Sequence, residues 1–144
     1  MLKGISPLVD AGLLSVLDRM GHGDEIVFAD AHFPSYSLNS TVLKISGVKA
    51  PDLLDAVLPL LELDTYVDDP VVMVAPVSGD SVDPDMAGDL QTVLTRHAPH
   101  IPGILFMERF AFYERARKAY AIVATGETRK YGNILLKKGV TVWP

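Results

Sequence analysis

The sequence predicts an α/β fold: a single domain over residues 1–144, in which a mixed, mostly parallel sheet is flanked by helices in a three-layer-like arrangement. Short apolar runs typical of buried strands alternate with segments whose apolar residues recur at helical spacing. Apolar residues make up 49% of the 144 positions, which is enough for a substantial core in one domain. No repeat, linker or low-complexity stretch divides the chain.

The first part of the chain predicts one helix and one buried strand. The helix is expected to begin at Ser6-Pro7, because proline is favoured at the first helical position. Its apolar spacing continues to Met20, and Gly21 suits the position just past a helix end. Residues 25–29, EIVFA, are nearly all apolar, as in a strand covered on both faces, and a loop over residues 32–40 follows.

The middle of the chain continues the alternation. Residues 41–45 predict a short strand, and a second helix opens at residues 50–52. Pro59 falls inside the apolar run of that helix, so we expect a kink or an early end there. Residues 70–77, PVVMVAPV, are the most apolar strand and are expected at the centre of the sheet, with Pro76 near the strand end.

The last third of the chain predicts two helices and three strands. The helices are expected over residues 85–97 and 108–119, and the strands over residues 104–107, 120–125 and 134–142. Residues 104–107 are apolar enough to be a buried strand. Glu114 and Lys118 are spaced for an i, i+4 ion pair. The last two strands are expected to form a hairpin-like pair.

Composition excludes several classes of function. The net charge of −5, without a basic cluster, argues against nucleic acid as a partner. There is no cysteine, so disulfides and thiolate metal sites are excluded, which fits a cytoplasmic protein. No apolar run reaches the roughly 18 residues that a membrane helix needs, so no membrane partner is expected.

Residues 20–34, MGHGDEIVFADAHFP, hold half of a candidate small-molecule site. His22 lies on a glycine-flanked turn, and an imidazole gives and takes protons near neutral pH. Asp30 ends a strand, where α/β sheets usually bind ligands. A surface histidine and a turn-forming aspartate explain these residues equally well, and Asp24 suits a cap or a partner for the imidazole. A metal held by His22, Asp30 and His32 is conceivable, but their spacing does not support it, so we expect none.

Arg109 and Tyr113 lie four residues apart on one predicted helix and therefore share a face. Arg109 directly follows a predicted strand, so its guanidinium can fork onto sugar oxygens or a carboxylate. An ion pair with Glu108 or Glu114 fits the spacing at least as well. For Tyr113, packing in the core is the default interpretation of an aromatic residue at helical spacing.

The turn before the last strand carries a phenol and a carboxamide, in Tyr131 and Asn133. An asparagine side chain both donates and accepts hydrogen bonds, so it reads hydroxyl groups well. Simple turn chemistry explains the same residues, and Asp64 after the second helix is equally consistent with a cap.

No phosphate-binding glycine loop, nucleophile triad or zinc motif is present. The remaining inventory is an imidazole, carboxylates, one arginine, tyrosines and one asparagine. This set suits proton transfer on a neutral, hydroxyl-rich ligand without a cofactor.

The motifs MGHGDEIVFADAHFP, LDTY, ERFAFYERA, AIVATGE and KYGNILLKKGV together resemble the L-fucose mutarotase family, the fucose mutarotase and ribose pyranase group. The likeness runs from LKGISP to LKKGV, nearly the whole chain. It implies an enzyme that interconverts the α and β anomers of a free sugar without a metal. It also implies a decamer of two stacked pentameric rings, with sites at subunit interfaces.

The resemblance assigns a role to each motif residue. His22 matches the proton donor, and Asp64 and Tyr113 match further catalytic or binding groups of the fucose-specific members. The substrate-binding positions that it implies are Asp30, Met73, Arg109, Tyr131 and Asn133. Residues 77–102 match the family motifs poorly, and nothing is carried over from them.

The expected function is therefore a mutarotase acting on L-fucose, with His22 donating a proton during ring opening. Arg109 favours the fucose branch, because the ribose-type members resemble this chain less at that position. The alternatives are a ribose pyranase, which exchanges pyranose and furanose forms, and a non-catalytic sugar-binding assembly module. The account requires that His22 face a cavity shared with the Arg109 helix and the Tyr131 turn.

Overall fold

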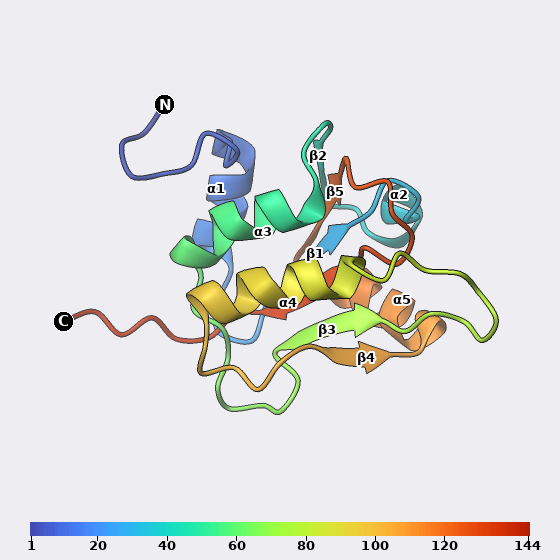
Figure 1. Cartoon of the computed structure of the whole chain (residues 1–144). Coiled ribbons are helices and arrows are strands. Elements are labelled where there is room, and N and C mark those ends of the chain that lie inside the picture. The colour runs from blue at the N-terminus through green and yellow to red at the C-terminus, as the bar shows by residue number, and fades with distance from the viewer.

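A six-stranded sheet with the order β2-β5-β1-β6-β3-β4 forms the centre of the molecule in the computed structural model, which describes all residues 1–144 (Figure 1). The strands are β1 (Glu25–Ala29), β2 (Val42–Ile45), β3 (Val71–Val74), β4 (Leu105–Met107), β5 (Ala121–Thr125) and β6 (Ile134–Lys137). Strand β6 runs antiparallel to β1 and β3, while the other pairs are parallel. The predicted mixed, mostly parallel α/β sheet is confirmed.

Helices cover both faces of the sheet and make three layers. They are α1 (Ala11–Arg19), α2 (Ser35–Leu38), α3 (Ala50–Val57), the 3₁₀ turn η1 (Leu58–Leu60), α4 (Met86–His97) and α5 (Arg109–Lys118). In β1, Ile26 and Phe28 join the apolar core under α1, α3 and α4, whereas Val27 and Ala29 join a smaller core under α2 and α5. Successive strand residues point to opposite faces, so a nearly all-apolar strand is what two covered faces require.

Two predicted boundaries in the first part of the chain are wrong. The first helix begins at Ala11 rather than at Ser6-Pro7, because the Asp10 carboxylate accepts a hydrogen bond from the Leu13 amide at 2.8 Å and caps the helix there. The segment predicted as a loop contains the single-turn helix α2. Pro59 does end α3 as predicted, since it lies in the 3₁₀ turn that follows.

The strand positions differ from the prediction in three ways. Strand β3 is buried on both faces but lies next to the edge strand, not at the centre, which β1 and β6 occupy. Helices cover both faces of β3, so its residues are apolar whatever its position in the strand order of the sheet. Strand β4 is an edge strand rather than a buried one, with Leu105 48% and Phe106 55% exposed. Strands β5 and β6 form no hairpin, because β1 lies between them.

The C-terminal segment also differs from the prediction. The last strand ends at Lys137, and the chain beyond residue 139 leads away from the domain (Figure 1). On α5, Glu114 pairs with Arg117 at 3.0 Å instead of with Lys118. Every helix of the structure is too short or too polar to cross a bilayer.

Candidate functional site

Five of the predicted site residues gather around one cavity of about 260 Å³ at the carboxyl-terminal end of β1 and β3, which we call the polar cavity. The predicted residues that line it are Asp30, Arg109, Tyr113, Tyr131 and Asn133. They come from the end of β1, from α5 and from the turn before β6, so segments far apart in the sequence meet there. This edge of an α/β sheet is where ligands usually bind.

Asp30 and Asn133 hold each other at the floor of the polar cavity. The Asn133 side-chain oxygen accepts a hydrogen bond from the Asp30 amide at 2.8 Å, and its nitrogen donates to Asp30 Oδ2 at 3.1 Å. The amides of His32 and Gly132 donate to the same carboxylate at 2.9 and 3.1 Å. Burial raises the pKa of Asp30 above its ordinary value, and these hydrogen bonds oppose the rise.

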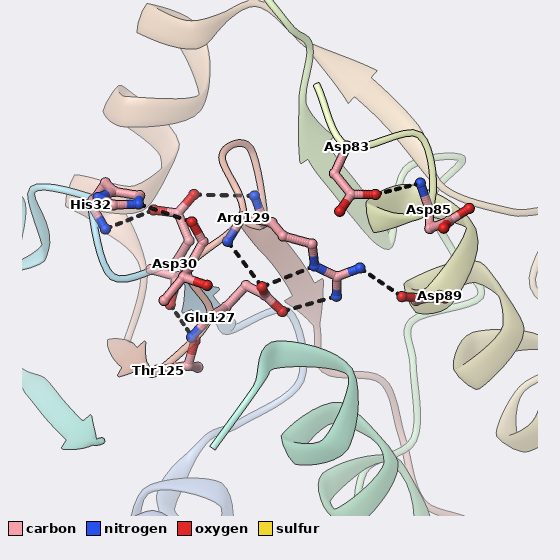
Figure 2. A network of polar contacts seen from close by, with 11 residues as sticks. Asp30, His32, Asp83, Asp85, Asp89, Thr125, Glu127 and Arg129 are labelled. Carbon is pink, nitrogen blue, oxygen red and sulfur yellow. Dashed lines mark hydrogen bonds and ion pairs between the residues drawn. The ribbon is translucent and has the colours of Figure 1, made fainter. Parts of the chain in front are cut away.

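A buried ion pair between Glu127 and Arg129 stabilises the turn between β5 and β6. Glu127 is 1% exposed, and its carboxylate accepts hydrogen bonds from the Arg129 amide and guanidinium, each at 3.0 Å. Figure 2 shows that the guanidinium continues to Asp89 on α4, at 2.7 Å. Burial disfavours the charged form of Glu127, but the hydrogen bonds from Arg129 outweigh it and lower the pKa of that carboxyl.

Close packing against this ion pair explains the glycine in the turn. A Cβ on Gly132 would lie 2.9 Å from Glu127 Cγ, so a larger residue would displace the ion pair. The preceding Tyr131 has a φ of 63°, a left-handed conformation that non-glycine residues rarely adopt. The ion pair thus holds a turn of strained conformation whose residues face the polar cavity.

Asp80 and Lys130 also line the polar cavity, although the sequence did not single them out. The Tyr131 phenol donates to Asp80 Oδ2 at 2.5 Å, and Lys130 Nζ donates to Oδ1 at 2.6 Å. Asp80 raises the pKa of Tyr131, while Lys130 and Tyr131 lower the pKa of Asp80. Asp80 lies in the polar turn before α4, where an aspartate beside a glycine reads as ordinary turn chemistry, so no local signal marked it.

Arg109 and Tyr113 reach the polar cavity from the first turn of α5. Glu108 starts this helix, because its carboxylate accepts a hydrogen bond from the Ala111 amide at 3.0 Å. The Arg109 guanidinium lies 4.6 Å from the ring centre of Phe110 and makes no ion pair with Glu108 or Glu114. Its N–H donors are therefore available to bind a ligand.

His22 lies at the opposite end of β1, with Asp64 and Tyr66. Its Nε2 is 3.3 Å from Asp64 Oδ1, and the rings of His22 and Tyr66 are 5.4 Å apart. The Tyr66 amide donates to Asp64 at 2.9 Å, and this bond, together with the neighbouring imidazole, lowers the pKa of Asp64. Asp24 instead caps the turn by accepting from the Gly21 amide at 2.7 Å.

Within one chain, the expectation that His22 shares a cavity with Arg109 and Tyr131 is not met. The five residues of β1 separate His22 from Asp30, roughly 16 Å at about 3.3 Å per residue. The metal site considered for His22, Asp30 and His32 is likewise split between two ends of the sheet, and no three His, Asp or Glu residues are placed to hold a metal ion.

Met73 lies beside the polar cavity rather than in it. It lines a mostly apolar cavity of about 350 Å³ with residues that include Val82 and Phe106. Tyr131 lines both cavities, so the two are neighbours. Met73, which the resemblance implies as a substrate-binding position, thus lines the neighbouring cavity rather than the one around Asp30.

Comparisons with known proteins identify relatives over the whole chain. A family model described as the RbsD / FucU transport protein family matches residues 3–141. The fucose mutarotase of Streptococcus pneumoniae, solved in complex with L-fucose, is 47% identical with a TM-score of 0.93, over 98% of this chain and 100% of that one. FucU from Bifidobacterium longum is 38% identical with a TM-score of 0.93, over 97% and 100%. RbsD of Bacillus subtilis, solved with D-ribose, shares the fold at 22% identity, a TM-score of 0.76 and coverage of 99% and 100%.

Proposed function

We propose, because this chain belongs to the RbsD / FucU family, that it is a cofactor-independent mutarotase that interconverts the α and β anomers of L-fucose. The observation that carries the proposal is the 47% identity, over essentially the full length of both chains, to a fucose mutarotase solved with that sugar. The relative solved with D-ribose is much more distant, at 22%, which favours fucose over the ribose pyranase alternative.

The chemistry of the polar cavity supports a monosaccharide ligand. Arg109 supplies a planar set of N–H donors, and Tyr131 supplies a phenol oxygen. Asp30 and Asn133 form a rigid floor because two hydrogen bonds join them. Polar groups that are fixed before binding suit a neutral ligand covered with hydroxyl groups, since no ordering is needed when the ligand arrives.

Anomer exchange requires the sugar ring to open and close. A base removes the proton of the anomeric hydroxyl while an acid protonates the ring oxygen, and the resulting aldehyde rotates and closes on its other face. Positioned acid and base groups accelerate such a step by roughly 10² to 10⁴. We assign proton donation to His22, with Asp64 holding the imidazole through the contact at 3.3 Å, and we assign Tyr113 to the cavity as a further candidate for proton transfer.

We propose that a second copy of the chain brings His22 to the polar cavity. The His22 end and the cavity end are different surfaces of one molecule, so their contact is head-to-tail, and repeated contacts of this type form a ring when the rotation between neighbours closes. Exposed aromatic residues at both ends support the contact: Tyr66 is 79% exposed beside His22, and Phe110 is 61% exposed beside Arg109. A decamer of two pentameric rings and a cytoplasmic location remain predictions.

The activity is tested by NMR saturation transfer between the signals of the two anomers, measured separately for L-fucose, ribose, galactose and glucose. We expect the protein to accelerate exchange of the two fucose anomers most strongly. Stronger acceleration with ribose, above all between its pyranose and furanose forms, would point to the pyranase. Sugar binding without faster exchange would contradict catalysis and favour a non-catalytic sugar-binding module.

A further inference from the structure

We propose that Asp80 is a positioning residue of the sugar site. With Lys130, it fixes the phenol of Tyr131 so that Tyr131 Oη faces the bound sugar as a hydrogen-bond acceptor. The proposal rests on the proposed function, since it places a sugar in the polar cavity.

The hydrogen bonds around the phenol set its direction. A phenol has one proton, and Tyr131 gives it to Asp80 Oδ2 at 2.5 Å. Lys130 Nζ occupies the other carboxylate oxygen at 2.6 Å. Tyr131 Oη accepts one long hydrogen bond, 3.4 Å from the Val77 amide, which leaves acceptor capacity on the cavity side. Asp80, Lys130 and Tyr131 all line the polar cavity.

The charges around Asp80 keep this direction at neutral pH. The hydrogen bonds from Lys130 and Tyr131 lower the pKa of Asp80, so it stays a carboxylate, which can only accept. The same carboxylate raises the pKa of Tyr131, so the phenol keeps its proton. Both oxygens of Asp80 are already occupied, and a carboxylate with a lowered pKa is a weak base. These facts favour a positioning role over proton abstraction by Asp80 itself.

An acceptor at this point complements the rest of the polar cavity. Arg109 offers donors only, and the Asp30 carboxylate already accepts hydrogen bonds from His32, Gly132 and Asn133. A sugar hydroxyl that accepts from Arg109 still has a proton that needs a partner. Tyr131 Oη can take that proton in a hydrogen bond, provided that its own proton points away from the sugar.

The substitution Asp80→Asn is expected to reverse the phenol. Lys130 has only donors, so it holds the amide oxygen of the new side chain and leaves the amide nitrogen facing Tyr131. The phenol then accepts from that nitrogen and turns its proton into the cavity. We expect the Kd for L-fucose, measured by protein NMR titration, to rise about tenfold, as for one lost hydrogen bond whose donor stays unpaired.

Asp83→Asn is the matched control. Asp83 lies in the same segment, does not line the polar cavity, and accepts a hydrogen bond from the Asp85 amide at 2.9 Å. Asparagine can accept that bond too, so D83N makes the same change of charge without touching Tyr131. We expect its Kd for L-fucose to stay within about twofold of the wild type, because Asp83 makes no hydrogen bond to Tyr131 and the charge of an exposed carboxylate is largely screened.

A double-mutant cycle with Tyr131→Phe separates positioning from a merely structural role. If Asp80 acts through the phenol, Y131F and the double variant D80N/Y131F bind L-fucose equally. An absorbance titration of the phenols supplies a second readout. The difference between the wild-type and Y131F curves gives the pKa of Tyr131, which is expected to lie above the ordinary value of 10.0. We expect this pKa to be lower in D80N.

Equal losses from D80N with and without the phenol would overturn the proposal, and so would an unchanged Kd in D80N. The Kd needs no turnover, so the cycle is independent of catalysis. A wild-type protein that binds L-fucose without accelerating anomer exchange would contradict the proposed mutarotase activity but would leave the outcome of the cycle decisive for Asp80.

Discussion

His22→Ala is expected to reduce the exchange of fucose anomers to the uncatalysed rate, a loss of roughly 10² to 10⁴ in the accelerated rate. An imidazole is the side chain best suited in general to proton transfer, and Asp64 lies 3.3 Å from the Nε2 of His22. The side chain of His22 is 46% exposed, so its loss leaves no cavity in the core and the fold should persist. Saturation transfer between the anomeric NMR signals measures the effect.

Two variants control this result. His22→Asn keeps a polar side chain that can bond to Asp64 but cannot transfer a proton at neutral pH, so it should be as inactive as H22A. His100→Ala removes an exposed imidazole from a turn and should be fully active. Wild-type exchange in a folded H22A protein would refute the assignment of His22 as proton donor.

Arg129→Met is expected to lower the free energy of unfolding by about 3 kcal/mol, the lower end of the range for removing one partner of a buried ion pair. The Glu127 carboxylate is 1% exposed and would lose both hydrogen bonds from the arginine side chain and the positive charge beside it. The lower end applies because Arg129 itself keeps 20% exposure. Urea denaturation measures the change. Arg96→Met, which breaks an exposed ion pair with Asp55, should cost less than about 1 kcal/mol.

The pH dependence of R129M should have the opposite sign to that of the wild-type ion pair. In the wild type, Arg129 lowers the pKa of Glu127, so the pair stabilises the fold above the unfolded value of 4.5 and this contribution is lost as the pH falls. Without the Arg129 side chain, burial is opposed only by the backbone amide of residue 129 and by Lys49, and we expect the pKa of Glu127 to rise above its ordinary value. The carboxylate then destabilises the fold increasingly as the pH rises above that unfolded value. Glu127→Gln in the R129M background should remove this dependence; a dependence that persists would point to another group.

The fold was predictable where the pattern is local. The buried strand β1 and the end of α3 at a proline both depend on the local sequence alone, and both predictions are confirmed. The order of strands depends on contacts between distant segments: β6 pairs with both β1 and β3, and no feature of its own sequence indicates this position. Strand β4 is exposed because it lies at the edge of the sheet. Its apolar residues Leu105 and Phe106 had predicted a buried strand instead.

The site was predictable only as separate groups. Asp30 and Asn133 were found from their motifs, and the structure adds that they bind each other across more than a hundred residues. Asp80 was missed because its role depends on the phenol of Tyr131, which approaches from a distant turn. The site of action of His22 stays a prediction, because within one chain its ring lies at the other end of β1 from Asp30 and the resemblance implies sites at subunit interfaces.

The most direct test of the shared site mixes two inactive variants. H22A lacks the proton donor and Arg109→Met lacks a sugar-binding group of the polar cavity, so each should be inactive alone. If neighbouring copies build each site together, denaturing and refolding an equal mixture creates intact sites wherever an R109M chain presents His22 to an H22A chain. Random assembly around a head-to-tail ring predicts about a quarter of the wild-type exchange rate per chain. A refolded mixture that stays as inactive as its two components would contradict a site completed by a second copy.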